Sequence, residues 1–126
     1  MICVGIIGGA GYTTGELIRL LLHHPQATIA FVHSSSNAGN ALTNVHAGLY
    51  GETDLLFTDQ MPFDTVDVLF LCSGHGESTR FLRSHDISVR VILLTNNFDF
   101  SVEDVSESLN GRTKKAIIFF AYFKFF

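Results

Sequence analysis

The feature that most constrains the fold of this chain is a glycine-rich turn between two apolar patterns. The residues GGAGYTTG, at positions 8–15, follow the run ICVGII and precede ELIRLLLHHP. The run at residues 2–7 is rich in β-branched side chains, which favours a strand buried on both faces, as in parallel sheets. A strand that ends in glycines and leads directly into a helix indicates an α/β arrangement.

The segment after the glycines has helical periodicity over residues 14–24. Apolar side chains recur at the spacing of one helix face, at Leu17, Leu20 and Leu21. Thr13 and Glu16 stand three residues apart and predict a capping box, and Pro25 predicts the end of the helix.

Further segments continue the alternation of strands and helices. A strand predicted at residues 28–32 completes a strand–helix–strand unit of about thirty residues. The polar stretch at residues 34–51 predicts a loop with one short helix. The remaining predicted elements are a small strand at 54–58, a strand at 66–72, a helix at 77–85 and a strand at 89–94. This order predicts an α/β fold with a Rossmann-like, doubly wound parallel sheet in truncated form.

The character of the sequence changes after residue 95. Residues 101–109 predict a short acidic helix, and five of the last ten residues are phenylalanine. The pattern at residues 117–126 matches neither an amphipathic helix nor a strand with clean alternation, and it needs a covering surface to avoid self-association. We therefore divide the chain into a partial domain at residues 1–95 and a divergent tail at residues 96–126.

Composition and charge exclude several classes of protein. Apolar residues make up 47% and charged residues 16%, which is typical of a globular chain. The net charge of −4 and a pI near 5.8 provide no attraction for nucleic acid or a membrane surface. The N-terminus lacks the layout of a signal peptide, and no apolar stretch reaches the ~20 residues of a membrane span. Cys3 and Cys72 lack metal-ligand spacing, so we expect reduced, buried thiols in a cytoplasmic protein.

The glycines fit a turn that binds phosphate groups. Gly8 permits a tight turn, and Gly11 lets the main chain approach a pyrophosphate because no Cβ stands in the way. The free N–H groups at the start of the helix then face the anion. The spacing is G-x-x-G-x-x-T-G, with Thr14 where a third glycine or alanine commonly packs the helix against the strand. A purely structural turn is the alternative interpretation.

The end of the second predicted strand bears on which dinucleotide binds. NAD-preferring domains carry an acid there for the ribose 2′-hydroxyl, but residues 29–51 contain none. Ser34, Ser35 and Ser36 offer hydroxyl donors that do not repel a 2′-phosphate, so the sequence favours NADP. An ordinary serine-rich loop is the alternative.

The third core strand ends in CSGHG, residues 72–76. Because the carboxyl ends of parallel strands border the ligand crevice, Gly74 and Gly76 would let this loop pass close to a cofactor. His75 either bonds a ligand or stabilises the loop. Cys72 lies in an apolar run with no base beside it in the sequence, so we interpret it as a core thiol. None of the histidines has metal-ligand spacing.

These motifs resemble the N-terminal half of the cofactor domain in the N-acetyl-γ-glutamyl-phosphate reductase family, which belongs with the aspartate-semialdehyde dehydrogenases. The resemblance covers residues 1–94 and rests on four motifs in the same order: VGIIGGAGYTTGELIRLLLHHP, SSSNAG, VHAGLYGETDL and DVLFLCSGHG. It implies NADPH-dependent reduction of an acyl phosphate in arginine biosynthesis. In that reaction a cysteine thiolate attacks, phosphate leaves, and hydride reduces the thioester to an aldehyde, with a histidine as acid–base partner.

The resemblance also implies which residues bind the cofactor. The pyrophosphate would lie against Gly8, Gly11, Tyr12, Thr13 and Thr14. Ser34 and Ser36 would lie near the adenosine ribose and its phosphate. Gly74 and His75 would border the nicotinamide. The implied partner is a small acyl-phosphate substrate, with no nucleic acid and no membrane, and the question of a homo-oligomer stays open.

The chain departs from the family after its fourth core strand. The family continues with a motif resembling D-L-S-x-D-F-R, where this chain has LLTNNFDF at residues 93–100. The sequence contains no N-P-G-C-like motif, and neither cysteine nor any histidine matches the family's catalytic pair, so we assign no catalytic residue. We expect a truncated reductase that is inactive alone. The alternatives are a non-catalytic NADP-binding module and a decayed gene product.

Overall fold

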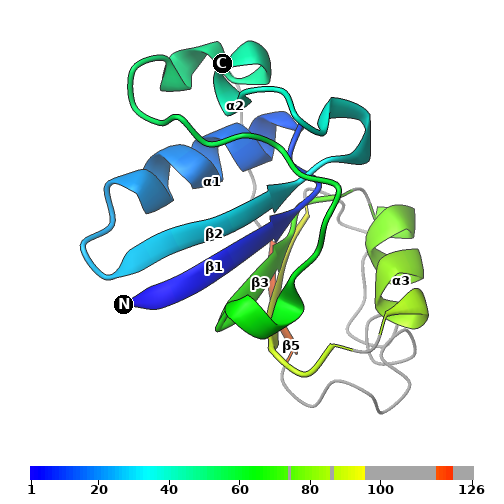
Figure 1. Ribbon diagram of the computed structural model, residues 1–126. Helices are drawn as coiled ribbons and strands as arrows, with labels where there is room; N and C mark the ends of the chain where they lie inside the picture. The colour runs from blue at the N-terminus through cyan, green and yellow to red at the C-terminus, as the bar shows by residue number, and fades with distance from the viewer. Residues whose placement is uncertain (74, 86, 96–115, 121–126) are drawn as a thin grey trace.

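The computed structural model describes residues 1–73, 75–85, 87–95 and 116–120 (Figure 1). The described strands are β1 (Ile2–Ile7), β2 (Ala27–His33), β3 (Val68–Leu71), β4 (Arg90–Thr95) and β5 (Ala116–Phe120). The helices are α1 (Tyr12–Leu22), α2 (Leu42–Val45) and α3 (His75–Ser84), with 3₁₀ turns η1 (Ser35–Asn37), η2 (Ala47–Leu49) and η3 (Phe63–Thr65). The helix predicted at residues 101–109 lies outside the described residues. No helix in the described part is long and apolar enough to cross a membrane.

The five described strands form one sheet in the order β2-β1-β3-β4-β5, and each neighbouring pair is parallel. The chain moves outward from β1 to β2 and then returns to the other side of β1 for β3. The direction of winding therefore reverses between β1 and β3. In open α/β sheets, ligands bind at such a switch point, outside the carboxyl ends of the strands. The predicted Rossmann-like, doubly wound parallel sheet is confirmed.

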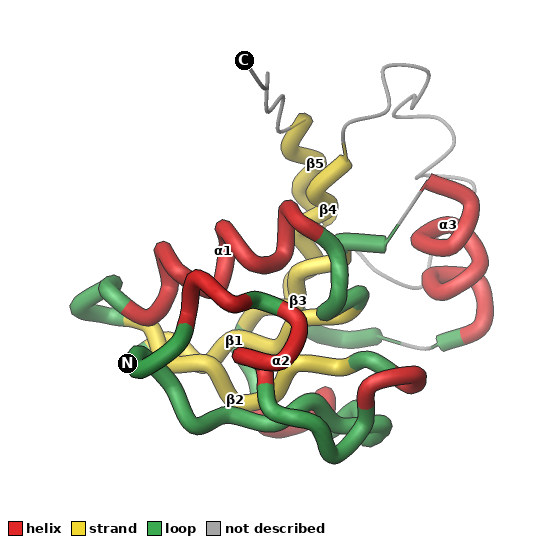
Figure 2. The backbone as a smooth tube through the Cα atoms, turned by 90° about the horizontal axis from the view of Figure 1, so that it is seen from above, coloured by secondary structure: helices red, strands yellow, loops and turns green. Residues whose placement is uncertain are grey.

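Alternating side chains divide the core into two clusters, one on each face of the sheet. On one face, Val4 and Ile6 of β1 pack in a cluster with Ile18 of α1. On the other face, Ile7 of β1 packs in a cluster with Leu82 of α3. Neighbouring residues of a strand point to opposite sides, so a single short strand supplies both clusters. The helices α1 and α3 accordingly lie on opposite faces of the sheet (Figure 2).

The helix α1 begins at Tyr12, two residues before the segment with helical periodicity at residues 14–24. Its N-cap is Gly11, with extended backbone angles of φ −76° and ψ 161°, and no side chain caps the helix. The predicted capping box is therefore wrong, because Thr13 already lies within the helix. Glu16 pairs instead with Arg19 on the helix surface at 2.7 Å.

Two predictions about strands need correction. Residues 54–58 form no regular strand; they make single bridges from His33 to Thr58 and from Ala41 to Leu56. In the tail, Ala116–Phe120 forms β5 and pairs with β4, although its pattern predicts no strand. Strands of parallel sheets read as continuous apolar runs, so the lack of alternation in this segment did not exclude one.

Candidate functional site

Two strand-to-helix turns meet at the carboxyl edge of the sheet. The glycine turn, residues 8–11, joins β1 to α1, and the turn that begins with Cys72 and Ser73, here the Cys72 turn, joins β3 to α3. The Cys72 amide donates to the Ile7 carbonyl at 2.9 Å, and a Cβ on Gly8 would lie 2.7 Å from the Ser73 nitrogen. Two turns in direct contact therefore line the switch point of the sheet.

The glycines of the glycine turn serve two different purposes. Gly8 has a φ of +86°, which side chains other than glycine rarely adopt. Gly9 is buried, and a Cβ on it would lie 2.7 Å from Val32 and 2.9 Å from Phe57. The fold itself therefore requires glycine at both positions. Gly11 is exposed, and a Cβ there would meet no atom within 4 Å, so the space beside it is open to a ligand.

Two side chains hold the carbonyl groups of the glycine turn. The buried Thr14 hydroxyl donates to the Gly8 carbonyl at 2.6 Å. The His46 ring, from the segment between α2 and η2, places Nε2 2.6 Å from the Gly9 carbonyl oxygen. Carbonyl oxygens repel anions, and both of these oxygens already accept hydrogen bonds inside the protein.

The amides of the glycine turn differ from its carbonyls in their hydrogen bonding. The Gly9 amide donates to the His33 carbonyl at 2.9 Å, which ties the turn to the end of β2. Within the described part of the chain, the amides of Ala10 and Gly11 donate no hydrogen bond. Together with the positive end of the α1 dipole, these donors make a surface suited to an anion.

The predicted 2′-phosphate residues lie at the end of β2. Ser34 is buried, its amide donates to the Thr58 carbonyl at 3.0 Å, and its hydroxyl accepts a hydrogen bond from Asn37 at 3.1 Å. Ser36 is exposed and accepts a longer bond from the same Asn37 amide at 3.4 Å. Asn37 thus brings Ser34 and Ser36 together, although it is absent from the sequence-based assignment.

The remaining predicted residues lie around the two turns. Tyr12, at the start of α1, is 61% exposed, and Thr13 beside it is half-buried. Gly74 lies outside the described residues. His75 is the first residue of α3, and the description covers its backbone alone.

The Cys72 turn is held by its own helix. The buried Ser78 hydroxyl of α3 donates to the Ser73 carbonyl at 3.1 Å. Cys72 packs against the α1 side of the core, and this burial raises the pKa of its thiol to about 11, opposed in part by a hydrogen bond with Thr14. A thiol that stays protonated at neutral pH is a poor nucleophile, which agrees with its interpretation as a core thiol.

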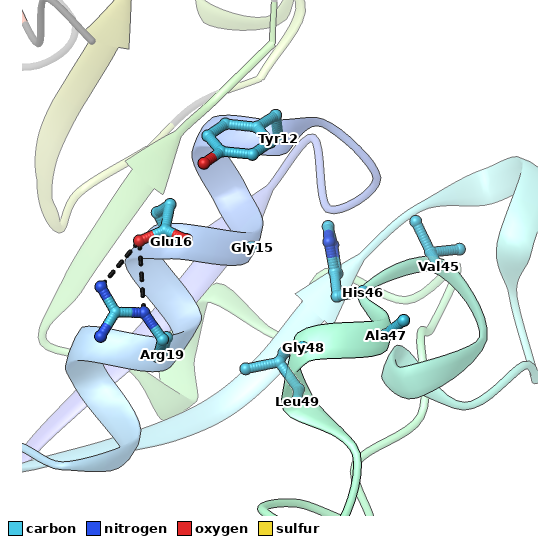
Figure 3. Close-up of a pocket in the computed structure, with 9 residues that line it drawn as sticks. All are labelled: Tyr12, Gly15, Glu16, Arg19, Val45, His46, Ala47, Gly48 and Leu49. Carbon is cyan, nitrogen blue, oxygen red and sulfur yellow. Dashed lines mark hydrogen bonds and ion pairs between the residues drawn. The ribbon is translucent and has the colours of Figure 1, made fainter. Parts of the chain in front are cut away.

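A cavity of about 280 Å³ lies between α1 and the segment around η2 (Figure 3). Tyr12, Gly15 and His46 line the end near the glycine turn. Glu16 and Arg19 lie along the α1 side, where the carboxylate raises the pKa of the guanidinium by hydrogen bonding and charge.

Sequence reasoning missed His46, which contacts the glycine turn from 37 positions further along the chain. One signal was available in the sequence. Gly15 lies inside an amphipathic helix, where glycine is costly and often marks a close approach of another group. The structure supplies that group, because a Cβ on Gly15 would lie 2.7 Å from Nδ1 of His46.

Comparison with known sequences gives a consistent result. The family model described as "Semialdehyde dehydrogenase, NAD binding domain" matches residues 3–119. The chain is similar to the N-acetyl-gamma-glutamyl-phosphate reductase of Bacteroides thetaiotaomicron, with 56% identity over 82% of the chain and 32% of the relative. It is 54% identical to the N-acetyl-gamma-glutamyl-phosphate reductase of Parabacteroides distasonis, again over 82% of the chain and 32% of the relative. The chain thus spans about a third of the length of these relatives.

Solved structures share the fold at lower identity. The aspartate semialdehyde dehydrogenase of Candida albicans, solved with NADP, superimposes with a TM-score of 0.60 at 21% identity over 78% of this chain and 30% of that one. The 1-pyrroline-5-carboxylate reductase of Streptococcus pyogenes gives a TM-score of 0.58 at 18% identity, over 89% of this chain and 38% of that one. At these identities the likeness concerns the fold alone.

Proposed function

This chain belongs to the family of semialdehyde dehydrogenase NAD-binding domains, and from that premise we propose that it is the dinucleotide-binding part of an N-acetyl-γ-glutamyl-phosphate reductase. The whole enzyme would use NADPH to reduce an acyl phosphate to a semialdehyde in arginine biosynthesis. One observation carries the proposal: the Gly8 and Gly9 carbonyls are bonded inside the protein, while the Ala10 and Gly11 amides donate to no group among the described residues. Identities of 56% and 54% to the two reductases support the substrate class.

The glycine turn fits the phosphates of a dinucleotide. The pyrophosphate would occupy the open space beside Gly11 and accept hydrogen bonds from the Ala10 and Gly11 amides. Tyr12 and Thr13, in the first turn of α1, would flank it. Thr14 would act indirectly, because its hydroxyl holds the Gly8 carbonyl rather than facing the ligand.

The preference for NADP over NAD rests on the end of β2. No acid lies between residues 29 and 51 to bond a free 2′-hydroxyl or to repel a 2′-phosphate. Ser36 is exposed there, and the hydroxyl of its neighbour Ser34 accepts from Asn37 and retains its own hydrogen to donate. Gly74 and His75 would border the nicotinamide.

We expect this chain to bind the cofactor without turning over substrate. The bound dinucleotide would supply hydride, but reduction of an acyl phosphate by this route also needs a thiolate beside the substrate. The Cys72 thiol has a pKa raised to about 11 by burial. Cys3 lies near the amino end of β1, at the edge of the sheet opposite the two turns. The relatives are about three times as long as the segment matched here.

Substitution of Gly11 tests the proposed site directly. Gly11→Val is expected to abolish NADP binding, a loss of at least about 100-fold, because the branched side chain fills the space for the pyrophosphate. Its folding should be spared, since a Cβ at this position meets no atom within 4 Å. Gly48→Val is the matched control, because Gly48 has equal room on η2. Equal affinities of parent and Gly11→Val, by calorimetry on folded samples, would refute the site.

Substitution of Ser36 tests the choice of dinucleotide. Ser36→Asp should weaken NADP more than NAD, by about tenfold in the ratio of affinities, because a carboxylate repels the 2′-phosphate and can bond a free hydroxyl. Ser88→Asp places the same charge on an exposed position between α3 and β4. If Ser36→Asp lowers the affinities for NADP and NAD equally, the serines belong to an ordinary loop and do not select the cofactor.

A turnover assay tests the expected inactivity of this chain. NADPH oxidation with N-acetyl-γ-glutamyl phosphate should stay at the background rate for the purified protein. The Cys72→Ser variant should behave in the same way. Turnover that disappears in Cys72→Ser would contradict both the expected inactivity and the interpretation of Cys72 as a core thiol.

A further inference from the structure

We propose that His46 is a positioning residue of the dinucleotide site, which orients the Gly9–Ala10 peptide so that the Ala10 amide faces the phosphates. The inference rests on the proposed function, because it gives a role to a residue behind the glycine turn. His46 is the single residue between α2 and η2, and the sequence patterns assigned it no role in binding.

The hydrogen bond from His46 controls a whole peptide plane. Nε2 of His46 lies 2.6 Å from the Gly9 carbonyl oxygen, which can only accept, so this nitrogen carries the hydrogen. In a trans peptide the C=O and N–H groups point in opposite directions. Holding the Gly9 carbonyl toward His46 therefore directs the Ala10 amide to the other side of the turn, and that amide donates to nothing in the described part of the chain.

The preceding peptide is held independently. The Gly8 carbonyl accepts from Thr14 and the Gly9 amide donates to the His33 carbonyl, at 2.6 and 2.9 Å. The Gly9–Ala10 peptide differs because, among the described residues, its only hydrogen bond is the one from His46 to the Gly9 carbonyl. Without that bond the peptide can rotate and turn a carbonyl oxygen toward the anion, which replaces an attraction by a repulsion.

The His46 ring is itself placed with little freedom. It stands beside Gly15 of α1 (Figure 3), where even a single Cβ would lie 2.7 Å from Nδ1. Its centroid lies 6.1 Å from that of Phe57, a ring that is 2% exposed. The His46 backbone amide donates to the Leu42 carbonyl at 2.8 Å. A donor held in this way loses little entropy when it bonds, which suits it to orient another group.

Two probes and two substitutions test this role on the full chain. In calorimetry, His46→Leu should weaken NADP about tenfold and adenosine 2′-phosphate, which lacks the pyrophosphate, less than about twofold. His46→Gln keeps an N–H donor near the position of Nε2 and should recover most of the NADP affinity. His23→Leu is the control, because it removes an exposed histidine at the other end of α1.

Each outcome decides the inference. Equal losses for both probes, or a Gln variant as weak as the Leu variant, would show a merely structural role and overturn it. If His46→Leu does not fold, His46→Asn replaces it, since its amide is too short to reach Gly9.

A second readout needs no nucleotide. In NMR spectra of the free chain, the carbonyl carbon of Gly9 should change its chemical shift in the Leu variant and return toward the parent value in the Gln variant, because this carbonyl loses and then regains its donor. If the parent chain does not bind NADP, the proposed function fails, and the chemical shift alone decides the role of His46. An unchanged shift in the Leu variant would then overturn it.

Discussion

The glycine turn and the Cys72 turn occupy equivalent places, each between a central strand and the helix that follows, yet they are held differently. In both, a buried hydroxyl near the start of the helix bonds a carbonyl of the turn, Thr14 to Gly8 and Ser78 to Ser73. The glycine turn has further ties, because the Gly9 amide and carbonyl bond residues of other segments.

The difference indicates which turn is prepared for a charged ligand. A turn that must present amides to an anion needs its carbonyls secured elsewhere, and the glycine turn meets that requirement through His46 and Thr14. The Cys72 turn begins with a thiol whose pKa is raised by burial, and it supports the glycine turn by contact with Gly8. We infer that the glycine turn holds the phosphates of the ligand, and that Cys72 and Ser73 support it by packing.

The largest expected effect breaks the contact between the two turns. Gly8→Ala should lower the free energy of unfolding by about 3 kcal/mol, because φ is +86° and the new Cβ would lie 2.7 Å from the Ser73 nitrogen. Gly39→Ala is a matched control with the same φ and no atom within 4 Å, and it should cost about 1 kcal/mol. Equal losses in urea titrations would mean that the turns do not constrain each other.

The next effect concerns the reactivity of the Cys72 turn. The pKa of Cys72 is raised from 9.0 to about 11, so at pH 8 its thiolate is about 100-fold scarcer than that of an ordinary thiol. Alkylation by iodoacetamide, followed by mass spectrometry in a Cys3→Ser background, should be slower by about that factor and should rise with pH up to about 11. Alkylation as fast as that of a free cysteine would mark Cys72 as a reactive group and reverse the comparison.

The smallest effect compares the two hydroxyls. Thr14→Val keeps the shape of the side chain but leaves the Gly8 carbonyl without its 2.6 Å bond, at an expected cost of about 2 kcal/mol. Ser78→Ala removes a longer bond of 3.1 Å and should cost about 1 kcal/mol. Thr14→Ser, which retains the hydroxyl, separates hydrogen bonding from packing. If Ser78→Ala lowers stability in thermal unfolding more than Thr14→Val does, the Cys72 turn depends more on its hydroxyl hydrogen bond than the glycine turn does.

Much of the central fold could be predicted from the sequence. The run at Ile2–Ile7 and the leucines of α1 are local patterns, and the structure places β1 and α1 close to the predicted bounds. The periodic segment starts two residues after α1 does, and Gly11 rather than a side chain provides the cap. β5 was missed because an apolar run looks alike in a buried strand and in an unstructured tail.

The sequence by itself determined the glycine turn, the switch between strand and helix periods, and the absence of an acid after β2. These features depend on the φ preference of glycine, on side-chain alternation and on residue identity, all of which act over a few neighbouring positions. Only the tertiary structure decided that His46 reaches Gly9, that Phe57 and Val32 forbid a side chain there, and that Asn37 joins Ser34 to Ser36. The contacts at Gly9 join segments far apart in the chain, and the bonds of Asn37 depend on side-chain directions set by the surrounding fold, so no local pattern specifies either.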